Sequence, residues 1–244
     1  MSKFKKISFS LVLIIVIIYI ISGFYNPLTT TCYTFSSDKI PSSFDGYHIT
    51  VVADFHCASF GENEEKLISA IAETNPDIIV FTGDNVDPTL PKENLSILLS
   101  GIKDIAPIYF VHGNDDYADS SYFTYAVNTF AEYGAIDMTD TSVTISNEDD
   151  SIILSGLDFY DASYTLRNTL GRADSDYFNI LLYHAANNFD EVSQYGYDLV
   201  LCGHSHGGVI RLPIIGGIVG NNRTIFPKYS KGVYIKNGST MIVS

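Results

Sequence analysis

The chain has 244 residues, of which 46% are hydrophobic and only 17% are charged, a composition typical of a folded domain rather than a disordered chain. Its 28 acidic residues against 14 basic ones give a formal net charge of −14, which disfavours contact with a nucleic-acid backbone, so no nucleic-acid partner is expected. Three cysteines without CxxC spacing indicate neither a disulfide framework nor a zinc knuckle, and Cys57 and Cys202 are expected to be buried.

An apolar run near the N-terminus predicts a membrane anchor. Lys3, Lys5 and Lys6 precede the apolar residues 7–21, which together with Phe24 and Tyr25 approach the ~20 residues that a membrane-spanning helix needs. A cleavable signal peptide is the alternative, but the residues after the run form a poor small-x-small cleavage site. The lysine flank predicts that residues 1–25 are a single-pass anchor with a cytoplasmic N-terminus and that the remainder is extracytoplasmic.

The next segment reads as a tether that leads into one compact domain. Residues 26–43 are rich in Thr, Ser and Pro, and Cys32–Ser36 is a candidate edge strand. The domain is expected to occupy residues 44–244, which is enough chain for one sizeable core.

Strand and helix patterns alternate in the first half of this domain. The predicted strands are Ile49–Ala53, Ile78–Thr82 and Pro107–Val111. The predicted helices are Glu62–Thr74, Lys92–Ile105 and Ser121–Tyr133. This alternation is typical of an α/β domain with parallel strands at its centre.

The second half is richer in strands and ends in a hairpin. The predicted strands are Val143–Ser146, Ile152–Ser155, Asn179–Tyr183, Asp198–Leu201, Val233–Lys236 and Ser239–Val243. Asn237-Gly238 between the last two is the strongest short hairpin signal. The fold class expected is therefore α/β, with two packed mixed β-sheets flanked by helices.

Five short polar clusters follow directly after predicted strands. They are Asp54-Phe55-His56, Gly83–Asp87, Gly113–Asp116, His184 and Gly203–Gly207. Ligands of α/β sheets bind beyond the carboxyl ends of strands, so these clusters are expected to meet at one rim. Imidazole and carboxylate together suit Zn, Mn or Fe, and a carboxylate such as Asp84 can bridge two ions. By contrast, His48 and His112 are expected to be core histidines, and Asp87 a structural partner in its loop.

The ordered set D-x-H, GD-x-x-D, GN-x-D, H and GHSH resembles the calcineurin-like metallophosphoesterases. Gly203–Pro213 and Phe44-Asp45-Gly46 are similar to the membrane-tethered bacterial branch, and the resemblance covers about residues 44–244. It implies a four-layer sandwich and two divalent metal ions (Mn, Zn or Fe). One ion would be held by Asp54, His56, Asp84 and His206, and the other by Asp84, Asn114, His184 and His204.

The same resemblance implies hydrolysis of a phosphoester or pyrophosphate bond in a phosphorylated small molecule or a lipid-linked substrate. The membrane-tethered branch resembles enzymes that cleave UDP-linked acylated glucosamine, so a nucleotide-sugar pyrophosphate at the membrane surface is one expected substrate. A general phosphodiesterase or phosphomonoesterase of soluble molecules is another.

Two departures from the family pattern bear on catalysis. The family's third motif carries a histidine that assists the leaving group, and Asp115 stands at that position, beside Asn114. A carboxylate cannot donate a proton at neutral pH unless its pKa is raised. Related chains also generally continue past a strand like Thr240–Ser244 into another strand. Both departures favour an alternative in which the protein is a metal-binding module with weak or lost catalysis.

Overall fold

The structure is a computed structural model that describes residues 10, 13–14, 16–19, 28–208, 210–212, 216–220 and 223–244. The predicted anchor at residues 1–25 therefore falls largely outside the described residues. Among those that are described, no helix combines the length and the apolar character needed to cross a membrane.

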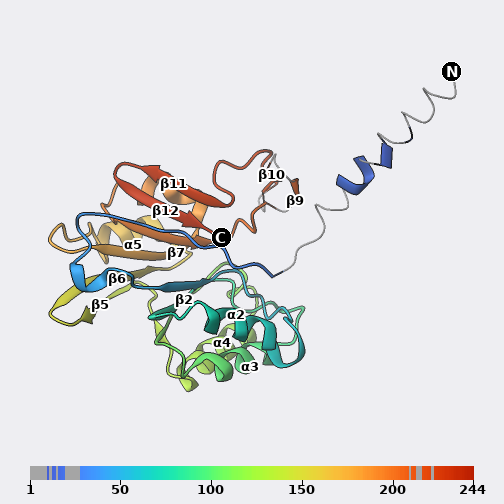
Figure 1. The fold of residues 1–244 in the computed structure, drawn as a ribbon, viewed down its shortest axis with the longest axis horizontal. Coiled ribbons are helices and arrows are strands. Elements are labelled where there is room, and N and C mark those ends of the chain that lie inside the picture. Colours follow the sequence, from blue (N-terminus) through green and yellow to red (C-terminus); the bar gives the residue numbers. More distant parts are fainter. Residues whose placement is uncertain are drawn as a thin grey trace.

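The first half of the domain forms a four-stranded parallel sheet covered by helices on one face (Figure 1). Its strands, in spatial order, are β1 (Ile49–Val52), β2 (Ile78–Thr82), β3 (Ile108–Val111) and β4 (Ile136–Asp137). The covering helices are α2 (Glu65–Glu73), α3 (Glu93–Ile102) and α4 (Ser120–Glu132), with the 3₁₀ turn η2 (Glu62–Glu64) before α2. The alternation of strand and helix in the sequence thus produces the parallel connections that it predicts.

The second half forms a six-stranded mixed sheet in the order β11-β12-β8-β7-β6-β5. The strands are β5 (Thr141–Asn147), β6 (Asp150–Leu157), β7 (Asn179–Ala185), β8 (Leu199–Gly203), β11 (Gly232–Lys236) and β12 (Ser239–Val243). The four central strands are parallel, whereas β5 and β11 are antiparallel edges. Helices α5 (Ala162–Asn168) and α6 (Phe189–Val192) and the turn η3 (Ala186–Asn188) accompany this sheet, and η1 (Ser42–Phe44) leads into the domain.

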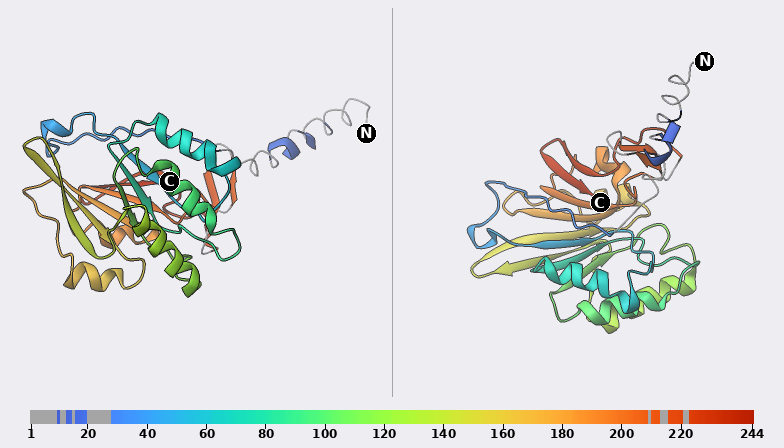
Figure 2. Two further views of the ribbon diagram at one scale, coloured as in Figure 1. Left: turned by 90° about the horizontal axis from the view of Figure 1, so that it is seen from below. Right: turned by 45° about the vertical axis from the view of Figure 1, so that its right-hand side comes forward.

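The two sheets pack face to face, so the domain has four layers (Figure 2). In β2, Ile78 and Val80 enter the core between the sheets, whereas Ile79 and Phe81 contact the core under α2, α3 and α4. All four side chains are at most 1% exposed, and burying each contributes ~1.5–3 kcal/mol. The predicted class, two sheets flanked by helices, is confirmed.

A small two-stranded sheet lies outside this frame. It consists of β9 (Ile210–Leu212) and β10 (Gly216–Val219), which pair antiparallel just after the last polar cluster. No sequence pattern predicted these strands. The predicted hairpin at the end is confirmed, because Asn237 and Gly238 both have positive φ, as the tight two-residue turn requires.

Two local predictions are wrong. Cys32–Ser36 is not a strand; the segment is held by side-chain packing instead, with the Phe35 and Phe178 ring centroids 5.6 Å apart. His48 is exposed rather than buried, because it precedes β1, and its ring bonds the carbonyls that end α2. His112, Cys57 and Cys202 are buried as predicted.

Candidate metal centre

Four polar clusters lie at or just beyond the carboxyl ends of β1, β2, β3 and β8, whereas His184 is the last residue but one of β7, which is longer than predicted. The non-glycine residues of these clusters that adopt positive φ are Asp54, His56, Asp84, His204 and His206. This backbone conformation costs of order 1–3 kcal/mol per residue and persists where surrounding contacts enforce it. Such concentrated strain is typical of a functional site.

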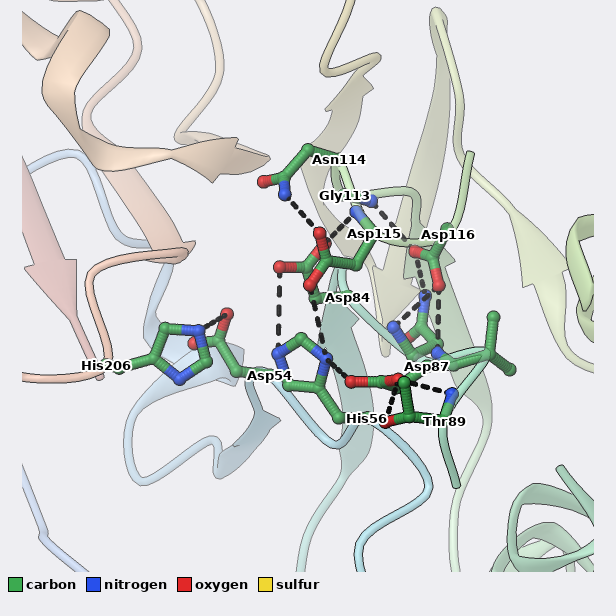
Figure 3. Close-up of polar contacts among 12 residues, drawn as sticks. Asp54, His56, Asp84, Asp87, Thr89, Gly113, Asn114, Asp115, Asp116 and His206 are labelled. Carbon is green, nitrogen blue, oxygen red and sulfur yellow. Dashed lines mark hydrogen bonds and ion pairs between the residues drawn. The ribbon is translucent and has the colours of Figure 1, made fainter. Parts of the chain in front are cut away.

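One group of candidate ligands joins the first, second and last clusters (Figure 3). Ligand atoms of Asp54, His56, Asp84 and His206 all lie within 4.8 Å of one another. His56 Nε2 is 3.7 Å from Asp84 Oδ2, and His206 Nε2 is 3.8 Å from Asp54 Oδ1. The His56 and His206 rings are stacked with centroids 5.1 Å apart, so both face the same small volume.

A second group shares Asp84 with the first. Asp84, His184 and His204 bring three ligand atoms within the same 4.8 Å limit. His184 Nε2 lies 3.1 Å from Asp84 Oδ2 and 3.0 Å from His204 Nδ1. On the other side of the His184 ring, Nδ1 donates to the Thr82 carbonyl at 2.8 Å. Because a carbonyl only accepts, this bond places the proton on Nδ1 and turns the Nε2 lone pair toward Asp84.

Backbone amides hold the two carboxylates in place. The His204 N–H donates to Asp54 at 2.8 and 3.1 Å, and the Asp115 N–H donates to Asp84 Oδ1 at 2.8 Å. Gly113 packs so closely that a Cβ there would overlap the Asp84 carboxylate. The tight approach of these loops explains why a glycine stands before Asn114.

The residues present fit metal ions. Both ring nitrogens of His56 and Oδ1 of Asn114 are buried and have no hydrogen-bond partner among the described residues. A buried polar atom left unpaired costs ~1–3 kcal/mol, and a cation in contact with these lone pairs would remove that cost. The mixture of imidazole nitrogens with carboxylate and amide oxygens is the donor set that Zn, Mn and Fe accept.

Mutual interactions set the charge states of the pair at the centre. Burial alone would raise the pKa of Asp84, but the hydrogen bond and charge of His184 outweigh it and lower that pKa. Burial likewise opposes protonation of His184, yet Asp84 raises the His184 pKa above its ordinary value. Burial and the neighbouring His184 charge lower the pKa of His204 to about 4, so this ring is uncharged at neutral pH.

Asp115 and Asp87 form a third acidic group around His56. Asp115 Oδ2 is 3.7 Å and Asp87 Oδ2 is 3.9 Å from His56 Nδ1. Asn114 Nδ2 donates to Asp115 Oδ1 at 2.6 Å. The other oxygen of Asp87 accepts from the backbone and hydroxyl of Thr89, which is the structural loop role expected of it. Figure 3 shows both carboxylates facing the His56 ring.

Asp116 is a positioning residue that the sequence did not reveal. Its Oδ1 accepts from the backbone N–H groups of Asn85 and Val86 at 2.7 and 3.0 Å. Its Oδ2 accepts from Asn85 Nδ2 at 3.0 Å and from Gly113 N at 2.8 Å. The carboxylate is 0% exposed, so it ties the loop after β2 to the loop after β3 from within.

An aromatic wall borders the histidines. The Phe159 ring lies 5.7 Å from His184 and 5.6 Å from His204, centroid to centroid, and 5.1 Å from Tyr160. Phe159 also lines a cavity of about 430 Å³, together with Tyr164 and Arg167 of α5. No sequence pattern marked these residues, because the turn between β6 and α5 brings them to the site.

Similarity to known proteins agrees with this geometry. Residues 47–208 match the calcineurin-like phosphoesterase family (Metallophos). The chain belongs to this family. Its enzymes are metal-dependent phosphate-ester hydrolases, and the bacterial relatives below fit that activity.

The curated relatives include several bacterial proteins. The chain is 32% identical over 232 residues to the uncharacterized metallophosphoesterase YkuE of Bacillus subtilis (strain 168), covering 88% of this chain and 76% of that protein. It is 28% identical over 177 residues to the phosphodiesterase YaeI of Escherichia coli (strain K12), covering 70% and 64% of the two chains.

Solved structures share the fold at low identity. The protein TT1561 of Thermus thermophilus superposes with a TM-score of 0.53 at 14% identity, covering 80% of this chain and 87% of that one. The phosphopantetheinyl hydrolase PptH of Mycobacterium tuberculosis has the same TM-score of 0.53 at 11% identity, covering 80% and 88%. At these identities the likeness describes the fold alone.

Proposed function

We propose that this protein is a phosphodiesterase that works with two divalent ions, one at each ligand group. The observation that carries the proposal is the sharing of Asp84 by two separate groups of candidate ligand atoms. Asn114, whose Oδ1 has no hydrogen-bond partner among the described residues, is the proposed fourth ligand of the second group, as the family resemblance implies. The ions are Mn, Zn or Fe, as the donor set allows.

When bound, such ions would neutralise charge on the phosphoryl oxygens and lower the pKa of a coordinated water. The protein's own residues supply the positioning. The Thr82 carbonyl fixes the His184 ring through Nδ1, and Asp116 holds the loops that carry Asp84 and Asn114. Preorganised groups of this kind need no rearrangement during the reaction, which is where enzymes gain most of their rate.

The substrate proposed is a phosphoester or pyrophosphate of a lipid-linked or nucleotide-sugar compound at the membrane surface, such as a UDP-acylglucosamine-type pyrophosphate. The predicted anchor at residues 1–25 and the name of the relative YaeI, a phosphodiesterase, support this choice. The cavity beside Phe159 gives room for the part of the substrate beyond the phosphate. Soluble phosphodiesters and phosphomonoesters are the competing substrates, and a side-by-side turnover comparison decides between them.

The decisive experiment compares metal content with turnover of an aryl phosphodiester in the Mn-loaded protein. Asp84→Ala is expected to lose both ions and all activity, whereas His56→Ala and His184→Ala each lose mainly one ion, because an imidazole serves one site. Asp104→Ala, an exposed aspartate after α3, is the matched control and should behave as wild type. Two ions retained in Asp84→Ala would rule out the shared carboxylate. Two ions without turnover in the wild type would favour the metal-binding module instead.

We also propose that residues 1–25 anchor the protein with its N-terminus in the cytoplasm and the catalytic domain outside. The lysine flank and the uninterrupted apolar run support this topology. A C-terminal reporter that is active only in the cytoplasm should stay silent. A signal from it would show that the topology is inverted.

A further inference from the structure

The charges of this protein are segregated along the chain. All 28 acidic residues lie between Asp38 and Asp198, where only 6 basic residues accompany them. Residues 199–244 contain five basic residues and no acidic residue. An acidic domain therefore carries one basic segment, and the candidate metal ligands His204 and His206 lie near the start of that segment.

The β9–β10 lobe is the outlying part of this basic segment, and we define it as residues 210–212, 216–220 and 223–226. Beyond the two strands, Ile225 bridges back to Val219, and the Phe226 N–H donates to the Ile218 carbonyl at 2.7 Å. The segment that follows the hairpin is thus folded against β10 as a third pass of chain. This makes the lobe an ordered β structure and not an extended loop.

Two large apolar side chains stand out from the lobe into solvent. Ile225 is 72% exposed and Phe226 is 64% exposed. The Phe226 backbone has a φ of +53°, which bulky residues rarely adopt, so the lobe holds this side chain at a conformational cost. Adjacent exposed apolar residues of this kind are typical of surfaces that contact a membrane or a partner.

Basic residues lie on and beside the lobe. Arg211 is in β9, Arg223 lies two residues before Ile225, and the side chains of Arg211 and Lys231 both come within 4 Å of where a Cβ on Gly207 would be. None of these three forms an ion pair with another described residue, whereas Lys228 and Lys236 both pair with Asp190. The lobe and its base therefore carry three cations without a described carboxylate partner, in a protein whose remaining residues are strongly acidic.

The lobe is also in direct contact with the candidate metal centre. Arg211 donates to the Gly207 carbonyl at 2.8 Å, and a Cβ on Gly217 would lie 3.0 Å from that same oxygen. Gly207 follows His206 in the chain. Whatever surface the lobe contacts therefore lies close to the metal ligands.

We propose that the β9–β10 lobe docks on an anionic lipid surface, with Ile225 and Phe226 entering the interface and Arg223, Lys231 and Arg211 facing lipid phosphates. The charge complementarity selects this partner, because an anionic surface attracts the lobe and repels the acidic remainder of the domain. The described helical residues between Ser10 and Tyr19 lie off the same side of the domain as β9 and β10 (Figures 1 and 2). Docking would present the metal centre to phosphate groups at that surface.

The absence of tryptophan from the chain permits a test that does not depend on activity. Phe226→Trp in the full-length protein, reconstituted in vesicles, creates a single fluorescent reporter at the tip. The matched control is Tyr177→Trp, because Tyr177 is 41% exposed and precedes β7, at the opposite end of that strand from His184. Ile225→Trp serves as a second reporter if the first variant fails to fold.

The expected result is a blue-shifted emission and protection from iodide for Phe226→Trp in vesicles that contain phosphatidylglycerol. Pure phosphatidylcholine vesicles should give a much smaller change, and Tyr177→Trp should show no change in either kind of vesicle. Adding Arg223→Glu or Lys231→Glu to the Phe226→Trp protein should reduce the docked-to-undocked ratio about fivefold or more for each residue changed.

Three results would overturn the proposal: no shift with either tip reporter, an equal shift in both kinds of vesicle, or an equal shift for Tyr177→Trp. A shift that appears in detergent without lipid and grows with protein concentration would identify a second copy of the chain as the occupant instead. Because none of these readouts uses turnover, the result is independent of whether the phosphodiesterase proposal holds.

Discussion

Asp116 offers the sharpest test of how the fold holds the site together. Its buried carboxylate accepts four hydrogen bonds from Asn85, Val86 and Gly113, at 2.7 to 3.0 Å. Asp116→Ala would leave all four donors buried without a partner. Removing one member of a buried charged network typically costs ~3–5 kcal/mol, a large fraction of the ~5–15 kcal/mol that stabilises a domain.

Asp116→Asn separates the two oxygens of this carboxylate. The amide oxygen can still accept from the Asn85 and Val86 backbone, but its NH₂ group must face the Gly113 N–H and the Asn85 side-chain NH₂. Two donors then lack an acceptor, at ~1–3 kcal/mol each, so the loss should be about 2–6 kcal/mol. Because Gly113 precedes Asn114, we also expect metal affinity to fall ~10–100-fold, as is usual when a residue that supports metal ligands is changed.

Urea unfolding of the full-length protein in mild detergent measures the first effect, and Mn titration measures the second. Asp119→Asn is the matched control, because Asp119 lies nearby and accepts backbone N–H bonds at the start of α4 while remaining exposed. It should change little, since Asn and Asp cap helices about equally. The reasoning would be refuted if Asp116→Asn unfolded within about 0.5 kcal/mol of the wild type, the range of ordinary surface substitutions.

Three further outcomes are expected. Asp115→His should raise turnover of alkyl phosphodiesters by up to ~10²–10⁴-fold and turnover of aryl phosphodiesters by less, because an alkyl leaving group needs a proton. Loss of activity in both Asp115→His and Asp115→Asn would contradict this prediction. Phe159→Ala should weaken Mn binding about tenfold, because the His184 ring loses the aromatic neighbour that restricts its position, whereas Phe159→Tyr should bind Mn as tightly as the wild type. Equal Mn affinity of the two variants would show that Phe159 does not position the His184 ring. Hydrogen bonds from Lys228, Lys236 and Tyr229 lower the pKa of Asp190 in the folded protein. The wild type should therefore be more stable than Asp190→Asn above about pH 4, and this difference in stability should vanish as the pH falls further. A difference in melting temperature that stays constant from pH 6 to pH 3 would refute this prediction.

The sequence predicted those parts of the fold that rest on local signals. The bounds of β2 and β12 are those expected, because an apolar β-branched run and an Asn-Gly turn specify them without help from distant residues. β4 was missed because a two-residue strand has no period to detect. β9 and β10 were missed because their pattern of glycines and short apolar runs matches no regular period.

The convergence of the candidate ligands was predictable because each lies at or beyond the carboxyl end of a recognisable strand, and parallel strands bring their carboxyl ends to one edge. The positioning role of Asp116 was not predictable, although Asp116 lies in one of the five polar clusters. Its hydrogen-bond partners in the loop after β2 are about 30 residues away in the chain, and the sequence does not show which donors surround a buried acid. Phe159 was missed for a similar reason. An aromatic residue after a strand is usually part of the core, and only the turn into α5 places this one against His184.

The position of Asp115 bears on how catalysis and metal binding are related. With 42% of its side chain exposed, the carboxylate faces His56 Nδ1 at 3.7 Å and accepts a bond from Asn114. It therefore contacts two candidate ligands and adds negative charge to a centre that already contains Asp54, Asp84 and Asp87. Opposite charges attract more strongly in a partly buried site than in water, so this carboxylate increases the attraction of the candidate centre for a cation. Asp115→His therefore changes two properties at once, because it adds a group that can donate a proton to the leaving group and removes a charge that attracts metal.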